Sequence, residues 1–177
     1  MRVLGTSRSS YGRRFSKTFG TTESRSMRFG LLLTAALLAA CAAPPPPKPI
    51  VTPVSLTLAA GADMNPDMRG RASPLTVRVY ALKSPGPFEV ADFFSLYDKD
   101  QATLGAELVL REERLLRPGE SQKIEMTLQA DTKAIGVLAA YRDLDRARWR
   151  EVRAVEPGKP LALTLNFGAR QIRIDQK

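Results

Sequence analysis

The feature that most constrains the fold of this 177-residue chain is an alternation of apolar and polar residues with a period of two. A β-strand points successive side chains to opposite faces of its sheet, so this pattern predicts strands that bury one face. The segments that alternate most clearly are residues 54–58, 75–81, 123–128, 161–167 and 172–174. The other strand candidates are residues 108–116, 135–141 and 149–155.

The strands and the turns between them indicate the fold class. Residues 135–141 are apolar throughout, as expected of a central strand that is covered on both faces. Residues 117–120 and 156–159 have a Pro-Gly centre, which favours a type II turn because proline fixes the first φ and glycine allows a positive second φ. About eight short strands with such turns predict an all-β domain, a sandwich of two antiparallel sheets.

One segment between the second and third strands changes period and predicts a small helical insertion at about residues 86–105. Its apolar residues recur at positions i, i+3, i+4 and i+7, which places them on one face of a helix that packs against a sheet. These residues are Val90, Phe93, Phe94 and Tyr97. We expect Asp98 or Asp100 to cap a second short helix that ends near Gly105.

The residue order near the N-terminus is typical of an export signal. Residues 1–28 hold seven Lys or Arg and one acidic residue, so most of the net charge of +9 lies there. The apolar stretch 29–40 follows, and small residues precede Cys41. Because a membrane-spanning helix needs about 20 apolar residues, this stretch is too short for a permanent span. The basic front segment also removes the main argument for a nucleic-acid partner.

The tetrad Leu-Ala-Ala-Cys that ends at Cys41 resembles the bacterial lipobox, and Cys41 is therefore the expected site of lipid attachment. The alternative, a buried cysteine in a core helix, is disfavoured because four prolines follow almost directly. We expect residues 27–40 to be the signal peptide, residues 41–52 to be a Pro-rich linker and residues 53–177 to be the sandwich domain. Residues 1–26 are interpreted as an over-extended start, with translation favoured from Met27 and Met1 as the alternative.

The sequence offers little material for catalysis or for a metal site. It has no histidine, and its single cysteine is the predicted lipid site. Asp63, Asn65 and Asp67 have the spacing of a calcium loop, but Met68 and Pro74 stand where such a loop needs glycine and glutamate. Asp143 and Asp145 lie among arginines and are expected to form ion pairs at the surface. These observations predict that the protein is not an enzyme and has no cofactor, no metal site and no small-molecule substrate.

A long connection separates the first two strands and is the best candidate for a binding site. It has about fourteen residues, 60–73, whereas most connections in compact domains have about four to six. Binding residues concentrate on loops that a rigid scaffold positions. The alternative is a solvated loop without a role.

Four stretches follow the cysteine in a characteristic order. They are NPDMRGRASPLTVRVYALKS, FEVADFFSLYDKD, LGAELVLREERLLRPGES and IGVLAAYRDLDRARWR. Together with the lipobox they resemble the outer-membrane lipoprotein of the type VI secretion system, the TssJ (SciN) family. The resemblance covers nearly all of the mature chain, from about Pro53 to Ile174.

The resemblance implies a fold, a location and a partner. The fold is a transthyretin-like β-sandwich with a small helical addition. The protein would be held in the outer membrane by acyl chains, with its domain in the periplasm. There it would bind the periplasmic C-terminal domain of TssM, which works with TssL, so that TssL is an indirect partner. Ala42, which follows the cysteine, is consistent with sorting to the outer membrane.

The resemblance also implies that the long loop contacts TssM. Within the loop, Asp67 and Arg71 are predicted polar contacts, and Met64 and Met68 are predicted adaptable apolar contacts. The loop residues assigned to the contact are Gly61, Ala62, Asp63, Met64, Asn65, Pro66, Asp67, Met68, Arg69, Gly70 and Arg71. Two other hypotheses stay open: a periplasmic module that binds a small ligand or another envelope partner, and an envelope hydrolase, which the lack of histidine disfavours.

Overall fold

The computed structural model describes residues 48–176. The predicted signal peptide, the lipid site Cys41 and the prolines at 44–47 lie outside the described residues. The elements, in chain order, are β1 (Val51–Ala60), β2 (Leu75–Leu82), α2 (Gly86–Val90), α3 (Phe93–Leu104), the 3-10 turn η2 (Gly105–Glu107), β3 (Leu108–Leu116), β4 (Ser121–Gln129), β5 (Ala134–Ala139), β6 (Arg150–Ala154), β7 (Leu161–Phe167) and β8 (Ile172–Gln176). Each of the eight predicted strands is present.

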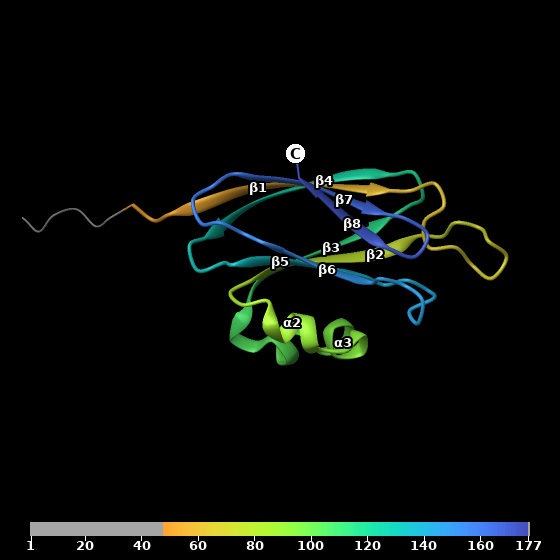
Figure 1. Ribbon diagram of the computed structural model, residues 1–177, viewed down its shortest axis with the longest axis horizontal. Helices are drawn as coiled ribbons and strands as arrows, with labels where there is room; N and C mark the ends of the chain where they lie inside the picture. Colours follow the sequence, from red (N-terminus) through yellow and green to blue (C-terminus); the bar gives the residue numbers. More distant parts are fainter. Residues whose placement is uncertain (1–47, 177) are drawn as a thin grey trace, which may run out of the picture. The chain divides into compact units, whose positions relative to one another are not determined.

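The strands form two four-stranded sheets that pack face to face, so the predicted all-β sandwich is confirmed (Figure 1). Sheet A has the strand order β4-β1-β7-β8, and sheet B has the order β3-β2-β5-β6. All neighbouring strands are antiparallel except β1 and β7, which pair in parallel from Val54 opposite Leu161 to Ala60 opposite Phe167. This pair departs from the predicted antiparallel arrangement. The chain between its two strands crosses to sheet B and back twice, which supplies the long connection that parallel strands need.

The main core lies between the two sheets. It is built from the apolar positions of the period-two pattern, which face each other across the sandwich because alternate side chains of a strand share one face. Its most deeply buried large side chains include Leu56, Leu58, Leu75, Leu116 and Phe167. For the clearly alternating strands β1, β2, β4 and β7, the sequence pattern therefore specifies which residues face this core.

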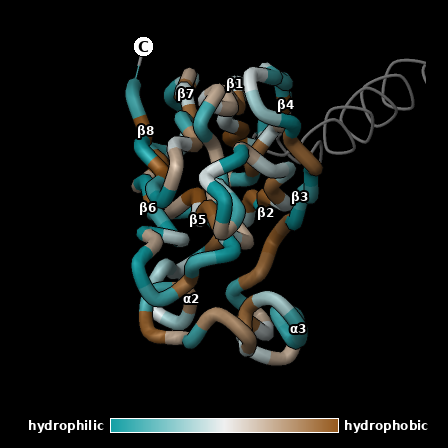
Figure 2. Tube along the Cα trace, turned by 90° about the vertical axis from the view of Figure 1, so that its right-hand side faces the viewer, coloured by the Kyte–Doolittle hydropathy of each residue, from teal (hydrophilic) through white to brown (hydrophobic). Residues whose placement is uncertain are grey.

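A third layer covers the outer face of sheet B, where α2 and α3 pack on β2 and β5 (Figure 2). Every residue of β5 is buried, as the apolar run predicts for a strand between two layers. A second apolar cluster fills this interface. Its buried members are Tyr80, Leu82, Phe88, Phe93, Leu96, Leu104, Ala134 and Leu138.

The helical insertion is confirmed, and Phe93 and Tyr97 pack in the second apolar cluster as predicted. The prediction is wrong for Val90 and Phe94. The chain forms two helices because Ala91, the C-cap of α2, is extended and Asp92 caps α3, its carboxylate accepting from the N–H of Ser95. Val90 and Phe94 therefore turn outward and are 84% and 64% exposed. Phe88, which falls outside the predicted pattern, is fully buried instead.

The predicted second short helix is present, because a kink divides α3 into two helical pieces, and Asp92 is the N-cap of the first. At the start of the second piece the Asp100 carboxylate accepts from the N–H of the next residue, Gln101. The helix is kinked at Lys99, whose φ and ψ are −138° and 32°, and Asp100 is buried beside it. The end near Gly105 is as predicted. Both Pro-Gly turns also form: Gly119 and Gly158 have φ of 76° and 80°, the positive values that a type II turn requires.

Candidate functional site

Three connections meet at one end of the sandwich. They are the long β1–β2 loop (residues 61–74), the β5–β6 segment (residues 140–149) and the β7–β8 turn (residues 168–171). All three lie at the end where β1 finishes, whereas the chain enters the sandwich at Val51, at the other end of β1 (Figure 1). The candidate loop is therefore separated from the entry point by the length of β1, about 33 Å at 3.3 Å per residue.

Asn65 ties the long loop to the β5–β6 segment. Its side-chain amide donates to the carbonyl of Pro74 at 2.8 Å, and its side-chain oxygen accepts from the backbone N–H of Arg142 at 2.9 Å. Its φ is 50°, a left-handed conformation that asparagine adopts more readily than most residues. Since the side chain is buried and both of its ends are occupied, Asn65 shapes the site instead of offering a contact.

Asp67 organises the tip of the loop. One carboxylate oxygen accepts from the backbone N–H groups of Arg69 and Arg71, and the other pairs with the Arg71 guanidinium at 2.7 Å. The Arg71 N–H is the main reason that the pKa of the Asp67 carboxyl is lowered from its usual value. Gly70 closes the turn with a hydrogen bond from its N–H to the carbonyl of Asp67. The tip thus holds its shape without a partner.

The two methionines predicted as apolar contacts lie in different environments. Met68 is fully exposed at the tip, as a contact residue should be. Met64 is fully buried and belongs to the core between the sheets, so its predicted role as a partner contact is wrong. The reason is local: the Met64 N–H donates to Gly61 and its carbonyl accepts from Ser73, which folds this part of the loop back over the end of the core.

The structure brings most of the predicted loop residues to the surface. Those that are exposed are Ala62, Asp63, Met68, Arg69, Gly70 and Arg71. Those that are partly exposed are Gly61, Pro66 and Asp67.

Neighbours that the sequence prediction missed come from the other two connections. Tyr141, at the end of β5, donates its hydroxyl to the carbonyl of Gln171, and burial raises the pKa of this phenol. The N–H of Arg148 donates to the carbonyl of Arg170. These bonds hold the β5–β6 segment against the β7–β8 turn. The dense arginines of the YRDLDRARWR stretch were the one sequence signal that pointed to this segment.

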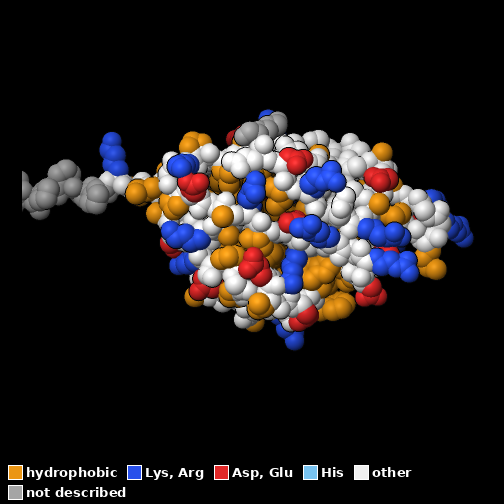
Figure 3. All heavy atoms as spheres, in the orientation of Figure 1, with side chains coloured by type: hydrophobic (Ala, Val, Ile, Leu, Met, Phe, Trp, Pro, Cys, Tyr) orange, Lys and Arg blue, Asp and Glu red, His pale blue; other side chains and the backbone are white. Residues whose placement is uncertain are grey.

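A groove of about 940 Å³ lies between these segments and is rich in arginine. Figure 3 shows basic side chains gathered at the end of the molecule opposite to where the chain enters. We call this groove the arginine groove. Its lining residues are Pro66, Asp67, Met68, Arg69, Gly70, Arg71, Arg142, Asp143, Arg146 and Arg170. The ion pairs predicted within the YRDLDRARWR stretch do not form among the described residues: Asp143 pairs with Arg170 at 3.0 Å, and Arg148 pairs with Glu151.

The residues Asn65 and Asp67, whose spacing resembles that of a calcium loop, form hydrogen bonds to the backbone instead. The side chains of Asn65 and Asp67 are engaged with N–H groups and the carbonyl of Pro74. Across residues 48–176 no group of three or more acidic, histidine or cysteine side chains is placed to hold a metal ion. In the same part of the chain, no helix combines the length and the apolar character that a bilayer crossing requires.

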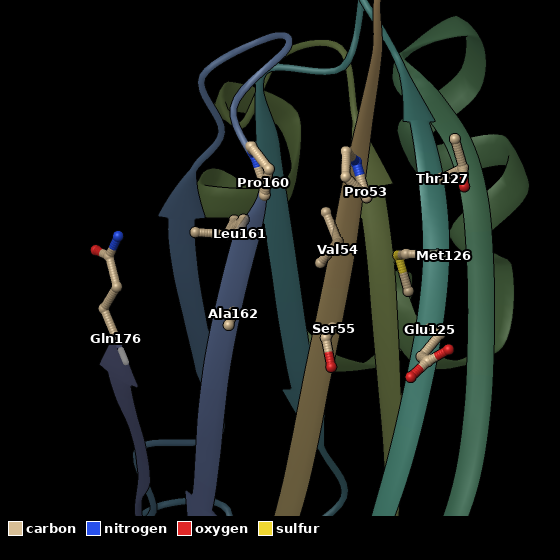
Figure 4. Close-up of a pocket in the computed structure, with 10 residues that line it drawn as sticks. All are labelled: Pro53, Val54, Ser55, Glu125, Met126, Thr127, Pro160, Leu161, Ala162 and Gln176. Atoms are coloured by element: carbon tan, nitrogen blue, oxygen red, sulfur yellow. The ribbon is translucent and has the colours of Figure 1, made fainter.

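A second hollow, of about 530 Å³, lies on sheet A across β1, β4 and β7 (Figure 4). Its lining is mostly small or apolar, with Pro53, Ser55 and Ala162 in adjacent strands, and Glu125 is its only ionisable side chain. Small-molecule sites are clefts or cavities that bury most of the ligand, and they are lined by apolar and aromatic side chains with a few well-placed polar groups. The described residues that line this hollow include no aromatic side chain, and the hollow lies on the surface of a sheet. The lining of this hollow gives little support to the small-ligand hypothesis.

Comparison with known proteins identifies the family. Residues 52–174 match the family model of the type VI secretion lipoprotein, described as "VasD, EvfM, TssJ, VC_A0113". The chain belongs to this family. A comparison with curated proteins found no match.

Solved structures support this assignment. The T6SS lipoprotein TssJ1 from Pseudomonas aeruginosa is 45% identical, with a TM-score of 0.70, over 71% of this chain and 96% of that chain. Serratia marcescens Lip, a membrane-bound component of the type VI secretion system, is 27% identical, with a TM-score of 0.66, over 73% and 98%. A chain in a structure described as "T6SS protein TssM C-terminal domain (869-1107) from EAEC" is 25% identical, with a TM-score of 0.59, over 69% and 99%.

Proposed function

We propose that this type VI secretion lipoprotein is a non-enzymatic tether that joins the periplasmic C-terminal domain of a TssM-like protein to the outer membrane. Its lipid would be attached at Cys41, and the contact would be made by the β1–β2 loop. TssL would be an indirect partner through TssM. Family membership supports the secretion role, and the similarity to a chain from a structure described by its TssM domain supports the choice of partner.

The observation that carries this proposal is the polarity of β1. The chain enters β1 at Val51, on the side of the predicted anchor, and leaves it at Ala60, where the candidate loop begins. A protein anchored ahead of Val51 would thus present the loop on the side away from its membrane attachment. This arrangement suits a tether, because one end of β1 faces the predicted membrane anchor and the other end carries the loop that would bind the partner.

Binding of the loop is tested by titration of the TssM-like C-terminal domain from the same organism. The protein is the mature chain, residues 41–177, carrying Cys41→Ser so that no acyl group contributes. A variant with Met68→Ser and Arg69→Ser removes two exposed side chains and leaves the backbone bonds of the tip intact. The matched control, Val90→Ser with Lys99→Ser, removes an exposed apolar and a basic side chain from the helical layer.

We expect the loop variant to bind at least about tenfold more weakly, a loss of about 1.4 kcal/mol, and the control to bind like wild type. If the loop variant and wild type bind with equal affinity, the contact with the TssM-like domain does not involve the side chains at the loop tip. Absence of binding by wild type would refute the choice of partner. The anchor is tested separately by fractionation of cells that express Cys41→Ser in the full chain, and a protein that still sediments with outer membranes would refute lipidation at Cys41.

A further inference from the structure

The arginine groove carries more positive charge than its own carboxylates can balance. Five arginines and two aspartates line it. Asp67 pairs with Arg71, and Asp143 pairs with Arg170. The remaining arginines form no ion pair with any residue between 48 and 176. They are Arg69, Arg142 and Arg146, all of them exposed.

We infer that this groove binds an acidic polypeptide segment of the protein's partner, with Arg69, Arg142 and Arg146 as the side chains that receive its carboxylates. A guanidinium presents its N–H groups as a planar fork that matches a carboxylate, and such charge-assisted pairs give both strength and orientation. The inference rests on the proposed function, because it names the chemistry of the same contact. It also adds the β5–β6 segment to a site that the sequence prediction confined to the β1–β2 loop.

The fold keeps the three arginines at one place. Asn65 holds the loop that carries Arg69 against the backbone of Arg142 by a hydrogen bond of 2.9 Å. The two ion pairs also line the groove and fix its walls, since Asp67 orients the loop tip and Asp143 joins the β5–β6 segment to Arg170. The groove is therefore pre-formed, which lowers the conformational cost of binding.

The lining and the position of the groove favour a polypeptide over a lipid surface. Met68 and Pro66 give the groove an apolar wall beside the arginines, and interfaces between proteins combine apolar contacts with arginine in this way. The groove lies at the end of β1 opposite to Val51, where the predicted anchor enters. An anchored molecule would then hold the groove away from the membrane to which it is attached.

A titration at two salt concentrations tests the inference. The mature chain carrying Cys41→Ser serves as the wild type, and the groove variant carries Arg142→Glu and Arg146→Glu in addition. Each of the two proteins is titrated with the TssM-like C-terminal domain. The control is Lys123→Glu with Arg173→Glu, which changes the net charge equally at exposed positions of sheet A outside the groove. Thermal melting of each variant confirms that it is folded. The substituted side chain of Arg142 takes no part in the bond to Asn65, which its backbone makes.

We expect the groove variant to lose about 100-fold in affinity, the control to stay within about threefold of wild type, and wild-type binding to weaken as salt rises. If the groove variant binds like wild type, the inference is overturned while the proposed function stands. If wild type does not bind, the proposed function falls and takes the inference with it.

A second arm distinguishes the lipid alternative. The same proteins are sedimented with vesicles of phosphatidylethanolamine and phosphatidylglycerol at a ratio of about three to one. We expect equal, low sedimentation of all three. Sedimentation of wild type that is lost only in the groove variant would assign the groove to an anionic membrane surface and overturn the inference.

Discussion

The side chain of Arg78 in β2 contacts both the backbone carbonyl and the aromatic ring of Tyr97 in α3. The Nη1 group of Arg78 donates to the Tyr97 carbonyl at 2.6 Å, and the guanidinium carbon lies 4.4 Å from the centroid of the Tyr97 ring. The helix is kinked at Lys99, and the N–H of Gln101, four residues after Tyr97, donates to the Asp100 carboxylate. Arg78 thus supplies a donor to a carbonyl next to the kink.

A second arginine supplies donors to carbonyls of the other helix. Arg150 of β6 donates from Nη1 to the carbonyl of Ala91 at 2.6 Å and to that of Phe88 at 3.2 Å. Arginines of sheet B thus bind carbonyls of both helices: Arg150 binds the C-terminal end of α2, and Arg78 binds α3 just before its kink at Lys99. Helix ends and kinks leave carbonyls without helical partners, and helix C-termini attract positive charge, so these two contacts hold the helical layer in register with the sheet.

Replacement of Arg78 by alanine should loosen the helical layer. The side chain is only 12% exposed, and its loss leaves the Tyr97 carbonyl and the Asp100 carboxylate with fewer partners. We expect the free energy of unfolding in urea to fall by about 2–4 kcal/mol. Arg153→Ala, at a partly exposed position of β6, the edge strand of the same sheet, removes only a surface hydrogen bond to Gln176 and should change it by less than about 0.5 kcal/mol. A loss for Arg78→Ala no larger than that control would show that the contact contributes no stability.

Asp100 should make stability depend on pH in the acid range. Burial raises the pKa of its carboxyl, but hydrogen bonding and charge from Arg111, 2.9 Å away, outweigh this, and the pKa is lowered from 3.8. A group whose pKa is lower in the folded state contributes stability above its unfolded pKa and loses it as the pH falls through the folded value. The melting temperature of wild type should therefore drop more steeply below about pH 4 than that of Asp100→Asn. Parallel curves for the two proteins would contradict this assignment.

Gly136 of β5 should tolerate no side chain. A Cβ atom at this position would lie 3.0 Å from the Phe88 ring and 3.1 Å from Leu82, in the interface between sheet B and the helices. Overpacking of this kind costs about 1–3 kcal/mol, so Gly136→Ala should lower the free energy of unfolding by that amount. Gly86→Ala is the matched control, since its Cβ would meet nothing closer than Ser84 at 3.8 Å. Equal stability of the two variants would show that Phe88 moves aside at little cost.

The strands were predictable because alternate side chains of a strand lie on opposite faces, so that burial of one face appears as a period of two in the sequence. Alternation fixed which residues of β1, β2, β4 and β7 face the core, and the apolar run of β5 revealed a second covered face. The parallel pairing of β1 with β7 was not predictable, because the same alternation suits either strand direction. Order and direction in a sheet depend on contacts between segments that are distant in the sequence.

The helical layer and the site were less predictable for a common reason. The break between α2 and α3 depends on the extended conformation of Ala91 and on the cap at Asp92, which a pattern of apolar residues does not register. In the same way, the groove needs Arg142 and Arg146 beside the loop, and the bond from Arg142 to Asn65 spans 77 residues. Loop conformation follows from such distant bonds and not from local periodicity.

Met64 and Met68 provide the sharpest test of the loop structure, because they are the same residue type four positions apart with opposite environments. Met64→Ala would open a cavity at the end of the core, and removal of a buried methionine side chain costs about 2–5 kcal/mol. Met68→Ala removes an exposed side chain and should leave the free energy of unfolding within about 0.5 kcal/mol of wild type.

Affinity for the TssM-like domain should show the opposite ranking. Met68→Ala should weaken binding directly, whereas Met64→Ala, measured well below its melting temperature, should retain it. Urea unfolding and calorimetric titration of the two variants give all four values. If Met64→Ala were as stable as wild type and bound its partner more weakly, the loop in solution would expose Met64 and would not have the conformation described above.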